Sequence, residues 1–306
     1  MEKIYDTIII GGGPAGYSAA LYCARNARST LVIEKLSAGG QMATSPHIEN
    51  YPGFDEAVDG FDLAEKMQHG AEHFGAETMY ETVTKLELSG EIKTVETTGG
   101  ILKSKTVLCA MGAYPRELGL KKEAQLRGKG IAYCATCDGM LFKNKDVIVV
   151  GGGNSAIADA LYLSKICHHV YLVHRRDSLR ASKVYEDQLK DSGIDIIWNS
   201  RVVDIKEDGI VRGAVLEDVH TNKLREIACD GIFVAVGRVA DTALVKDQLT
   251  LDDHGYILAD ETTKTNLDGV FAIGDIRSKP LRQIVTAASD GATASKFVEE
   301  YLMRLK

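Results

Sequence analysis

Thr7-Ile8-Ile9-Ile10-Gly11-Gly12-Gly13-Pro14-Ala15-Gly16 is an apolar run that ends in a glycine-rich turn. Its first four residues predict a short strand buried on both faces, as in a parallel sheet. A helix-like stretch follows at residues 19–24, and a second apolar run, Leu31-Val32-Ile33, ends in Glu34. Strand, glycine turn, helix, strand and terminal acid are the parts of a dinucleotide-binding unit, in their usual order and spacing.

The glycines of this turn follow the spacing G-x-G-x-x-G, and each has a separate expected role. Gly11 permits the tight turn, Gly13 lets the backbone approach a pyrophosphate, and Gly16 allows close packing of helix and strand. The helix N-terminus then faces the phosphates, while Glu34 accepts hydrogen bonds from a ribose. The spacing alone could mark an ordinary turn, so the prediction of a dinucleotide site depends on the complete unit. Its candidate residues are Gly11, Gly13, Pro14, Ala15, Gly16, Glu34 and Lys35.

The same unit occurs a second time, with its first glycine at position 151 instead of 11. Val147-Ile148-Val149-Val150 is the expected strand, and Gly151-Gly152-Gly153-Asn154-Ser155-Ala156 is the expected turn. The next strand, Tyr171-Leu172-Val173, ends at His174, which takes the place of Glu34. The chain therefore uses one dinucleotide-binding design twice. The candidates in the second turn are Gly151, Gly153, Asn154, Ser155 and Ala156.

The two copies differ at the position that reads the ribose. An acid such as Glu34 favours a free 2′-hydroxyl, because it would repel a 2′-phosphate. The second copy has His174-Arg175-Arg176 there, followed by Arg180, and guanidinium groups bind phosphate in a bidentate manner. This cluster could also be a solvated basic patch ahead of a surface helix. Because it stands at the ribose position in a chain of net charge −7, it predicts NADPH rather than NADH at the second site.

Cys134-Ala135-Thr136-Cys137-Asp138 lies between the two glycine turns in the sequence. Two cysteines at this spacing can close and reopen a small disulfide ring, and the spacing lowers the pKa of a thiol. Asp138 could give or take a proton beside the leaving thiolate. A zinc site is rejected, because it needs about four ligands and the chain has no second CxxC or paired His-Cys spacing. A redox disulfide accompanied by two dinucleotide sites predicts an electron relay.

The composition is that of an ordinary globular protein, with 306 residues, of which 45% are hydrophobic and 26% charged. This length suits two domains. No apolar run approaches the roughly 18 residues of a membrane span, and the strand pattern that begins near Tyr5 leaves no room for a cleavable signal peptide. The acidic net charge argues against nucleic acid as a partner. Together with a single CxxC, these features predict a cytoplasmic protein.

Other segments carry weaker signals. The remaining cysteines, expected to be small buried side chains within helices or strands, are Cys23, Cys109, Cys167 and Cys229. Residues 81–107 alternate polar and apolar positions like an antiparallel meander, and residues 202–233 repeat that texture. The similar segments Ala110-Met111-Gly112-Ala113 and Ala235-Val236-Gly237-Arg238 bracket the second unit and are the expected crossing points between domains.

Polar groups also gather in two turns and in the C-terminal tail. Residues 39–42 and 49–53 carry uncharged polar side chains that suit a neutral heterocycle, although they could be ordinary loops. A strand is expected before Gly274-Asp275, and Arg282-Gln283 opens a helix expected over residues 284–302. Asp275 could bind a polyol hydroxyl. The helix N-terminus could stabilise negative charge on a flavin, or the helix could simply pack against the core.

Together these residues resemble the bacterial-type, low-molecular-weight thioredoxin reductases, over essentially the whole chain. The resemblance rests on both glycine turns, Gly40-Gln41, residues 49–53, Cys134–Asp138, the arginine cluster and Gly274-Asp275. It implies an α/β fold of two Rossmann-like, three-layer ββα dinucleotide-binding domains. Residues 1–112 and 239–306 would bind FAD, and an inserted domain of residues 113–238 would bind NADPH and carry the CxxC. It also implies a homodimer whose inserted domain swings, so that either the nicotinamide or the dithiol faces the flavin.

The resemblance implies roles for individual residues as well. Cys137 would lie next to the flavin, Cys134 would attack the disulfide of thioredoxin, and Asp138 would act as acid and base. Glu34 would meet the FAD ribose, with Gln41 and Asn50 near the isoalloxazine. The further flavin-site candidates are Gly40, Gln41, Asn50, Gly274, Asp275, Arg282 and Gln283, and those for the NADPH 2′-phosphate are His174, Arg175, Arg176 and Arg180.

Two other functions stay open at this point. The runner-up is a flavin-dependent disulfide reductase of the same fold that is fed by ferredoxin or that serves another redoxin. The intact arginine cluster counts against the ferredoxin version. A non-catalytic redox sensor that uses the dithiol as a switch is the alternative from a different class.

Overall fold

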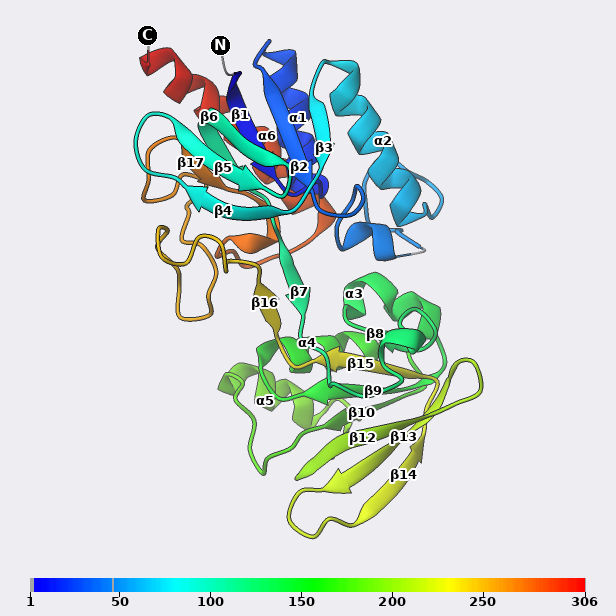
Figure 1. The fold of residues 1–306 in the computed structure, drawn as a ribbon. Coiled ribbons are helices and arrows are strands. Elements are labelled where there is room, and N and C mark those ends of the chain that lie inside the picture. The colour runs from blue at the N-terminus through cyan, green and yellow to red at the C-terminus, as the bar shows by residue number, and fades with distance from the viewer. Residues whose placement is uncertain (1–2, 46, 306) are drawn as a thin grey trace. The chain divides into compact units, whose positions relative to one another are not determined.

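The structure is a computed structural model that describes residues 3–45 and 47–305. The chain divides into two compact units, of which the first is Met1–Tyr114 with Val239–Lys306 and the second is Pro115–Arg238. Each unit is built on a sheet of its own, which is mixed in the first unit and parallel in the second (Figure 1). Two short strands, β7 (Ala113–Pro115) and β16 (Arg238–Ala240), pair with each other where the chain passes from one unit to the other. The predicted α/β fold with two Rossmann-like units is confirmed.

The first unit contains a seven-stranded sheet in the order β3-β2-β1-β6-β5-β4, with β17 paired to β6. Its strands are β1 (Ile4–Ile10), β2 (Thr30–Glu34), β3 (Glu77–Tyr80), β4 (Val83–Glu87), β5 (Lys93–Thr97), β6 (Gly100–Cys109) and β17 (Val270–Ala272). β4, β5 and β6 pair antiparallel, as predicted for residues 81–107. The helices are α1 (Pro14–Arg25), α2 (Gly60–His73) and α6 (Ile284–Arg304), with the 3₁₀ helices η1 (Met42–Thr44) and η4 (Gly274–Ile276).

Strand β1 is apolar at successive positions because both of its faces are covered. Alternate side chains of a strand point to opposite faces of the sheet. Ile9 packs in one cluster with Ala20 of α1 and Val298 of α6, whereas Ile8 packs in a second cluster with Val95 of β5. Burial of each such side chain stabilises the fold by about 1.5–3 kcal/mol. The strand therefore holds the following glycine turn at the end of a rigid sheet.

The second unit contains a five-stranded parallel sheet in the order β11-β10-β9-β15-β8 and a three-stranded antiparallel sheet in the order β12-β13-β14. The first sheet consists of β8 (Ile131–Ala132), β9 (Asp146–Gly151), β10 (His169–Val173), β11 (Asp195–Ile197) and β15 (Gly231–Ala235). The second consists of β12 (Ser200–Glu207), β13 (Val211–Asp218) and β14 (Leu224–Ala228). The helices are α3 (Ala135–Asp138), α4 (Asn154–Leu163) and α5 (Lys183–Lys190), with the 3₁₀ helices η2 (Ala124–Leu126) and η3 (Gly139–Phe142).

Strand β9 repeats the arrangement of β1. Val149 packs with Ile157 of α4 on one face of the sheet, whereas Ile148 packs with Ile205 of β12 on the other. The parallel sheet is thus enclosed between helix α4 and the antiparallel sheet, which is the three-layer order that the resemblance implies. Among the residues described, no helix has the length and apolar character needed to span a bilayer.

Candidate functional site

The first glycine turn connects β1 to α1, and its three glycines meet different surroundings. Gly11 has a φ of 106°, and a Cβ there would lie 2.4 Å from the Ala110 carbonyl oxygen. A Cβ at Gly16 would lie 2.0 Å from the Gly11 carbonyl oxygen. At Gly13, by contrast, the nearest atom to such a Cβ is the Gly39 oxygen at 4.0 Å. Two of the glycines are required by packing, and the third leaves open space at the start of α1, which suits an approaching phosphate.

Glu34 is held against this turn by both of its carboxylate oxygens. Oε2 accepts the Gly12 N–H at 2.7 Å, and Oε1 accepts the N–H groups of Lys35 at 2.7 Å and Leu36 at 3.2 Å. The carboxylate is half-buried, whereas Lys35 is exposed. Glu34 therefore stands at the end of β2 with a fixed orientation and free lone pairs, as a ligand for ribose hydroxyls needs.

Two loops of the first unit carry further predicted residues, one against the turn and one against the start of α6. The Gly39 N–H donates to the Gly12 oxygen at 2.7 Å, and a Cβ at Gly40 would lie 3.9 Å from the Gly13 Cα. Gln41 follows directly and precedes η1. In the other loop, the Asn50 side-chain amide donates to Gln283 Oε1 at 3.1 Å.

The C-terminal tail of the first unit also lies against the glycine turn. Gly274 has a φ of 74°, and a Cβ there would lie 2.9 Å from the Ala15 Cβ. Arg282 Nε donates to the Asp275 carbonyl oxygen at 3.2 Å, which closes the segment on itself. Gln283 caps α6 in a capping box with Thr286. The structure therefore draws the predicted first-site residues from five separate parts of the chain, and their binding to FAD stays a prediction.

The second glycine turn connects β9 to α4 and differs in detail from the first. A Cβ at Gly151 would lie 2.5 Å from the Ala235 oxygen, whereas a Cβ at Gly153 would meet nothing within 4 Å. Asn154 Oδ1 accepts the Ser182 N–H at 2.8 Å, and Ser155 is exposed in the first turn of α4. Ala156, which stands where the first turn has Gly16, is fully buried. Open space at the start of a helix is again available to a phosphate.

The basic cluster lies directly beside this second turn. The Arg180 N–H donates to the Gly152 oxygen at 2.7 Å, and Arg175 and Arg176 are exposed. His174 differs from the arginines because it is 7% exposed and its ring packs on Gly152, where a Cβ would lie 2.1 Å from the ring. Burial lowers the pKa of His174, so that a neutral imidazole donates from Nε2 to the Ser178 oxygen at 3.0 Å. His174 thus fills space and leaves the arginine guanidinium groups as the cations that face solvent.

Cys134 and Cys137 are joined in a disulfide, with 5.3 Å between their Cα atoms. Cys134 is the N-cap residue of α3, and the Asp138 N–H donates to its carbonyl oxygen at 3.1 Å. Burial raises the pKa of the Asp138 carboxyl to about 6, against the opposing pull of the Arg127 charge. Asp138 can therefore hold and release a proton near neutral pH, close in the chain to both sulfur atoms.

A buried anchor beside the disulfide was not predicted from the sequence. Glu123 is 1% exposed and accepts the Tyr133 hydroxyl at 2.8 Å and the Leu118 and Gly119 N–H groups at 2.9 and 2.8 Å. The Arg127 guanidinium lies over the Tyr133 ring, 4.9 Å from its centroid. The anchor thereby fixes the residue that precedes Cys134. The only signal in the sequence is the tyrosine next to the CxxC, and no pattern links it to position 123.

The remaining cysteines are free thiols. Cys23 in α1 and Cys109 in β6 are buried, as predicted, and Cys229 is buried as predicted but lies outside a strand, whereas both parts of the prediction are wrong for Cys167. Cys167 lies in the turn after α4 and is only half-buried, and Cys229 is buried in the short connection between β14 and β15. Helix α4 ends at Leu163, so that Cys167 lies in the turn between this helix and β10. The described residues contain no group of three or more potential metal ligands.

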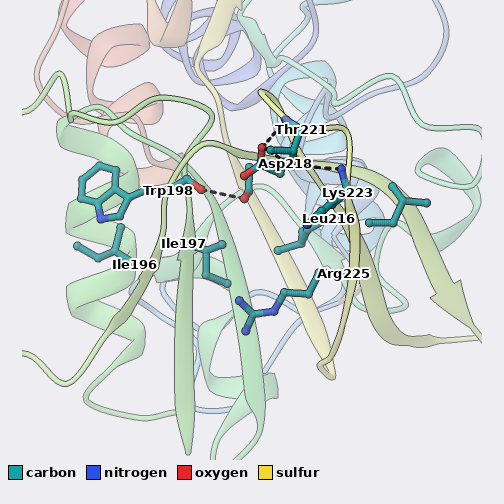
Figure 2. A pocket seen from close by; sticks show the side chains of 10 residues that line it. Ile196, Ile197, Trp198, Leu216, Asp218, Thr221, Lys223 and Arg225 are labelled. Carbon is teal, nitrogen blue, oxygen red and sulfur yellow. Dashed lines mark hydrogen bonds between the residues drawn. The ribbon is translucent and has the colours of Figure 1, made fainter.

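A cavity of about 520 Å³ lies in the second unit, and its lining residue Trp198 packs edge-on against the His174 ring, with 6.3 Å between the ring centroids (Figure 2). It is lined by residues of β11, β12, β13 and β14 and of their connections, and no predicted site residue lines it. Figure 2 shows Thr221 beside Asp218, whose Oδ1 accepts the Thr221 N–H at 2.7 Å and the Thr221 hydroxyl at 3.0 Å. The Asp218 carboxylate is thus used in the local turn.

The chain is similar to known proteins over its full length. The family profile of the pyridine nucleotide-disulphide oxidoreductases matches residues 5–291. A thioredoxin reductase of Listeria monocytogenes is 46% identical over 307 residues, which cover 100% of this chain and 96% of that protein. A thioredoxin reductase of Peptoclostridium acidaminophilum is 44% identical, over 99% and 98% of the two chains. The crystal structure of thioredoxin reductase from Streptococcus pyogenes superimposes with a TM-score of 0.93 at 43% identity, over 99% of this chain and 100% of that one. The chain therefore belongs to the pyridine nucleotide-disulphide oxidoreductase family and, within it, to the bacterial-type thioredoxin reductases.

Proposed function

We propose that this protein is an enzyme that carries FAD and passes electrons from NADPH through the Cys134/Cys137 pair to the disulfide of thioredoxin. The observation that carries this proposal is the disulfide itself, with a proton-exchanging carboxyl at Asp138, in a unit that also holds a glycine turn and an arginine cluster. The names of relatives with 44% and 46% identity support the same acceptor.

The first unit is the proposed site of FAD. The open space at Gly13, the oriented Glu34 carboxylate and the polar pair Asn50–Gln283 match the pyrophosphate, ribose and ring system of that cofactor. Asp275 lies in the same tail segment and would accept a hydrogen bond from a ribityl hydroxyl. FAD, when bound, supplies the two-electron chemistry that links a hydride donor to a disulfide.

The second unit is the proposed site of NADPH. The open space at Gly153 accommodates the pyrophosphate, and the exposed guanidinium groups of Arg175 and Arg176 would bind the 2′-phosphate. Arg180 belongs to the same cluster, because its backbone is hydrogen-bonded to the glycine turn. The buried His174 ring, which packs on Gly152, would support the backbone that carries the arginines.

Once two electrons have reached the disulfide, the two cysteines and Asp138 account for every bond and proton of the exchange with the acceptor. Reduction of the Cys134–Cys137 disulfide consumes two electrons and two protons and produces two thiols. Cys134, as a thiolate, attacks the acceptor disulfide and forms a mixed disulfide. Cys137 then attacks Cys134 Sγ, which restores the ring and releases the acceptor as a dithiol. Asp138, with a pKa of about 6, accepts a thiol proton and returns it to the leaving thiolate.

The alternative functions differ from this proposal in measurable ways. A ferredoxin-fed reductase would leave the cluster of Arg175, Arg176 and Arg180 without a role. A reductase of another redoxin would share every step except the final acceptor. A redox sensor would cycle the disulfide without turnover of NADPH.

An anaerobic titration with NADPH and, separately, NADH tests donor and cofactor together. We expect a yellow protein whose flavin absorbance is bleached at low NADPH concentration and responds far less to NADH. A protein bleached by dithionite but not by NADPH would point to another donor. A colourless protein that cannot be reconstituted with FAD would overturn the proposal.

Cysteine variants test the relay itself. We expect Cys134→Ser and Cys137→Ser each to abolish the NADPH-dependent reduction of thioredoxin while the protein keeps its flavin. Turnover of thioredoxin by either variant at the parent rate would contradict the mechanism. Cys167→Ser is the matched control, because it changes a half-buried free thiol of the same unit and should leave turnover unchanged.

We further propose that the protein is a cytoplasmic homodimer. The dimer rests on the family to which the chain belongs. The free thiols of Cys23, Cys109 and Cys229 are compatible with a reducing compartment. Light scattering after size-exclusion chromatography tests the dimer, and fractionation of cells tests the location.

A further inference from the structure

A cluster of three buried charged side chains lies behind the Gly274–Asp275 turn of the first unit. Asp290 of α6 is 6% exposed, and the side chains of Arg277 and Lys279 are each 5% exposed. Neither the glycine turns nor the dithiol step uses these residues. Because buried charges are costly unless they are paired, their presence at this place requires an explanation.

Asp290 joins the cluster to the turn through both of its oxygens. Oδ2 accepts the Gly274 N–H at 2.9 Å, Arg277 Nε at 2.9 Å and Lys279 Nζ at 2.7 Å, while Oδ1 accepts Arg277 Nη2 at 2.8 Å. Burial acts to raise the pKa of Asp290, but the hydrogen bonds from Arg277 and Lys279 hold it below its usual range. The carboxylate is therefore charged and fixes the turn to α6.

Lys279 and Arg277 make further hydrogen bonds within the same segment. Lys279 Nζ donates to the Thr286 oxygen in the first turn of α6 at 3.2 Å. The carbonyl oxygen of Arg277 accepts Arg282 Nη2 at 3.2 Å. Residues 274–286 are thereby held as one piece, and this piece contains the predicted flavin-site residues Gly274, Asp275, Arg282 and Gln283.

The charges of the cluster do not cancel. Two buried cations share one buried carboxylate, so the cluster carries one excess positive charge. The carboxylates of Glu261 and Asp260 also act on Arg277. Glu261 lies 3.9 Å away with a side chain that is 95% exposed, and Asp260 is exposed as well, so water screens both. An ion pair of Arg277 and Asp290 alone would be neutral and would keep the hydrogen bond to the Gly274 N–H. Lys279 is therefore the source of the excess positive charge. A buried excess charge acts through a medium of low dielectric constant and favours a nearby anion.

We propose that Arg277, Lys279 and Asp290 are positioning residues for FAD, and that Lys279 supplies excess positive charge that stabilises the anionic cofactor on residues 274–283. This inference rests on the proposed function, because it requires FAD in the first unit. It adds to that function a source of affinity for FAD, the buried charge of Lys279, that lies outside the predicted phosphate-binding turn.

The test compares Lys279→Met with Lys279→Arg and with Lys296→Met in the purified holoprotein. Lys279→Met removes the charge and leaves Asp290 its bonds to Arg277 and Gly274, so the fold should persist. Lys279→Arg keeps the charge. Lys296→Met makes the same charge change at an exposed position of α6. The readouts are FAD release on serial dilution, followed by flavin fluorescence, and the midpoint potential of the bound flavin.

We expect Lys279→Met to weaken the binding of FAD about tenfold, which is the order expected of one buried charge, and to make the midpoint potential more negative. Lys279→Arg should restore most of both properties, and Lys296→Met should match the parent. Equal FAD affinity and potential in Lys279→Met and the parent would overturn the inference while leaving the proposed function intact. A parent protein that binds no FAD would overturn both. Weak binding in Lys279→Arg as well as in Lys279→Met would show a packing role and overturn the assignment of charge.

Discussion

The two glycine turns share one sequence pattern, but the structure uses them differently. In the first, Gly11 has left-handed backbone geometry, and Gly16 is so close to Gly11 that a Cβ cannot be accommodated. In the second, Gly151 is outside the left-handed region, and a buried Ala156 occupies the position of Gly16. The first turn is therefore the tighter of the two.

The residues at the ends of β2 and β10, the strands that follow α1 and α4, also differ between the two sites. Glu34 is hydrogen-bonded to the first turn through its carboxylate, whereas His174 packs its neutral ring on the second turn. The arginines beside His174 face solvent. A tight turn with a fixed acid suits a cofactor that stays bound through many cycles, and a looser turn with exposed cations suits one that exchanges at every turnover.

The largest expected effect comes from exchanging the residues at the position where the turns differ. Gly16→Ala places a Cβ 2.0 Å from a backbone oxygen, so the turn must open at a cost of about 1–3 kcal/mol. We expect the purified variant to lose most of its flavin absorbance. The matched change Ala156→Gly removes a methyl group from a helix, at a cost of about 1 kcal/mol, and should leave the flavin content unchanged. Equal flavin loss in both variants would contradict a difference in tightness.

A smaller effect is expected from the arginines of the second site. Replacing Arg175 and Arg176 together by Gln removes charged donors to the 2′-phosphate, and hydrogen bonds to charged groups contribute about 1.5–3 kcal/mol each. We expect the KM for NADPH to rise at least about tenfold, while the KM for NADH changes little. Arg212→Gln is the control, because it changes an exposed arginine of the same unit. A parallel rise for NADPH and NADH would identify the cluster as a non-specific basic surface.

Much of this difference was accessible from the sequence, because the signals are local. Four apolar residues before a glycine turn predict a buried strand, and the predicted pieces appear as β1, β2, β9 and β10. The change from Glu34 to His174 is also visible in the chain. Whether the predicted site residues bind FAD and NADPH stays a prediction.

What the sequence did not reveal depends on contacts between distant segments. The hydrogen bond between Asn50 and Gln283 spans 233 positions, and no local pattern encodes such a contact. The bond from Tyr133 to Glu123 spans only 10 positions but depends on how the loop folds around a buried carboxylate. Asp290 is one polar residue in an amphipathic helix, and only its burial distinguishes it from a solvated acid.

The smallest effect expected is a dependence of stability on pH that comes from His174. Its pKa is lowered by burial, so below the ordinary value of 6.5 the unfolded chain binds a proton that the folded chain does not. Above that value the residue is neutral in both states and contributes nothing. Stability should therefore fall as the pH drops from 7.5 to 5, and the urea midpoint of the parent should fall further than that of His174→Gln. Identical pH dependence in the parent and in His174→Gln would show that the imidazole does not distinguish the second turn from the first.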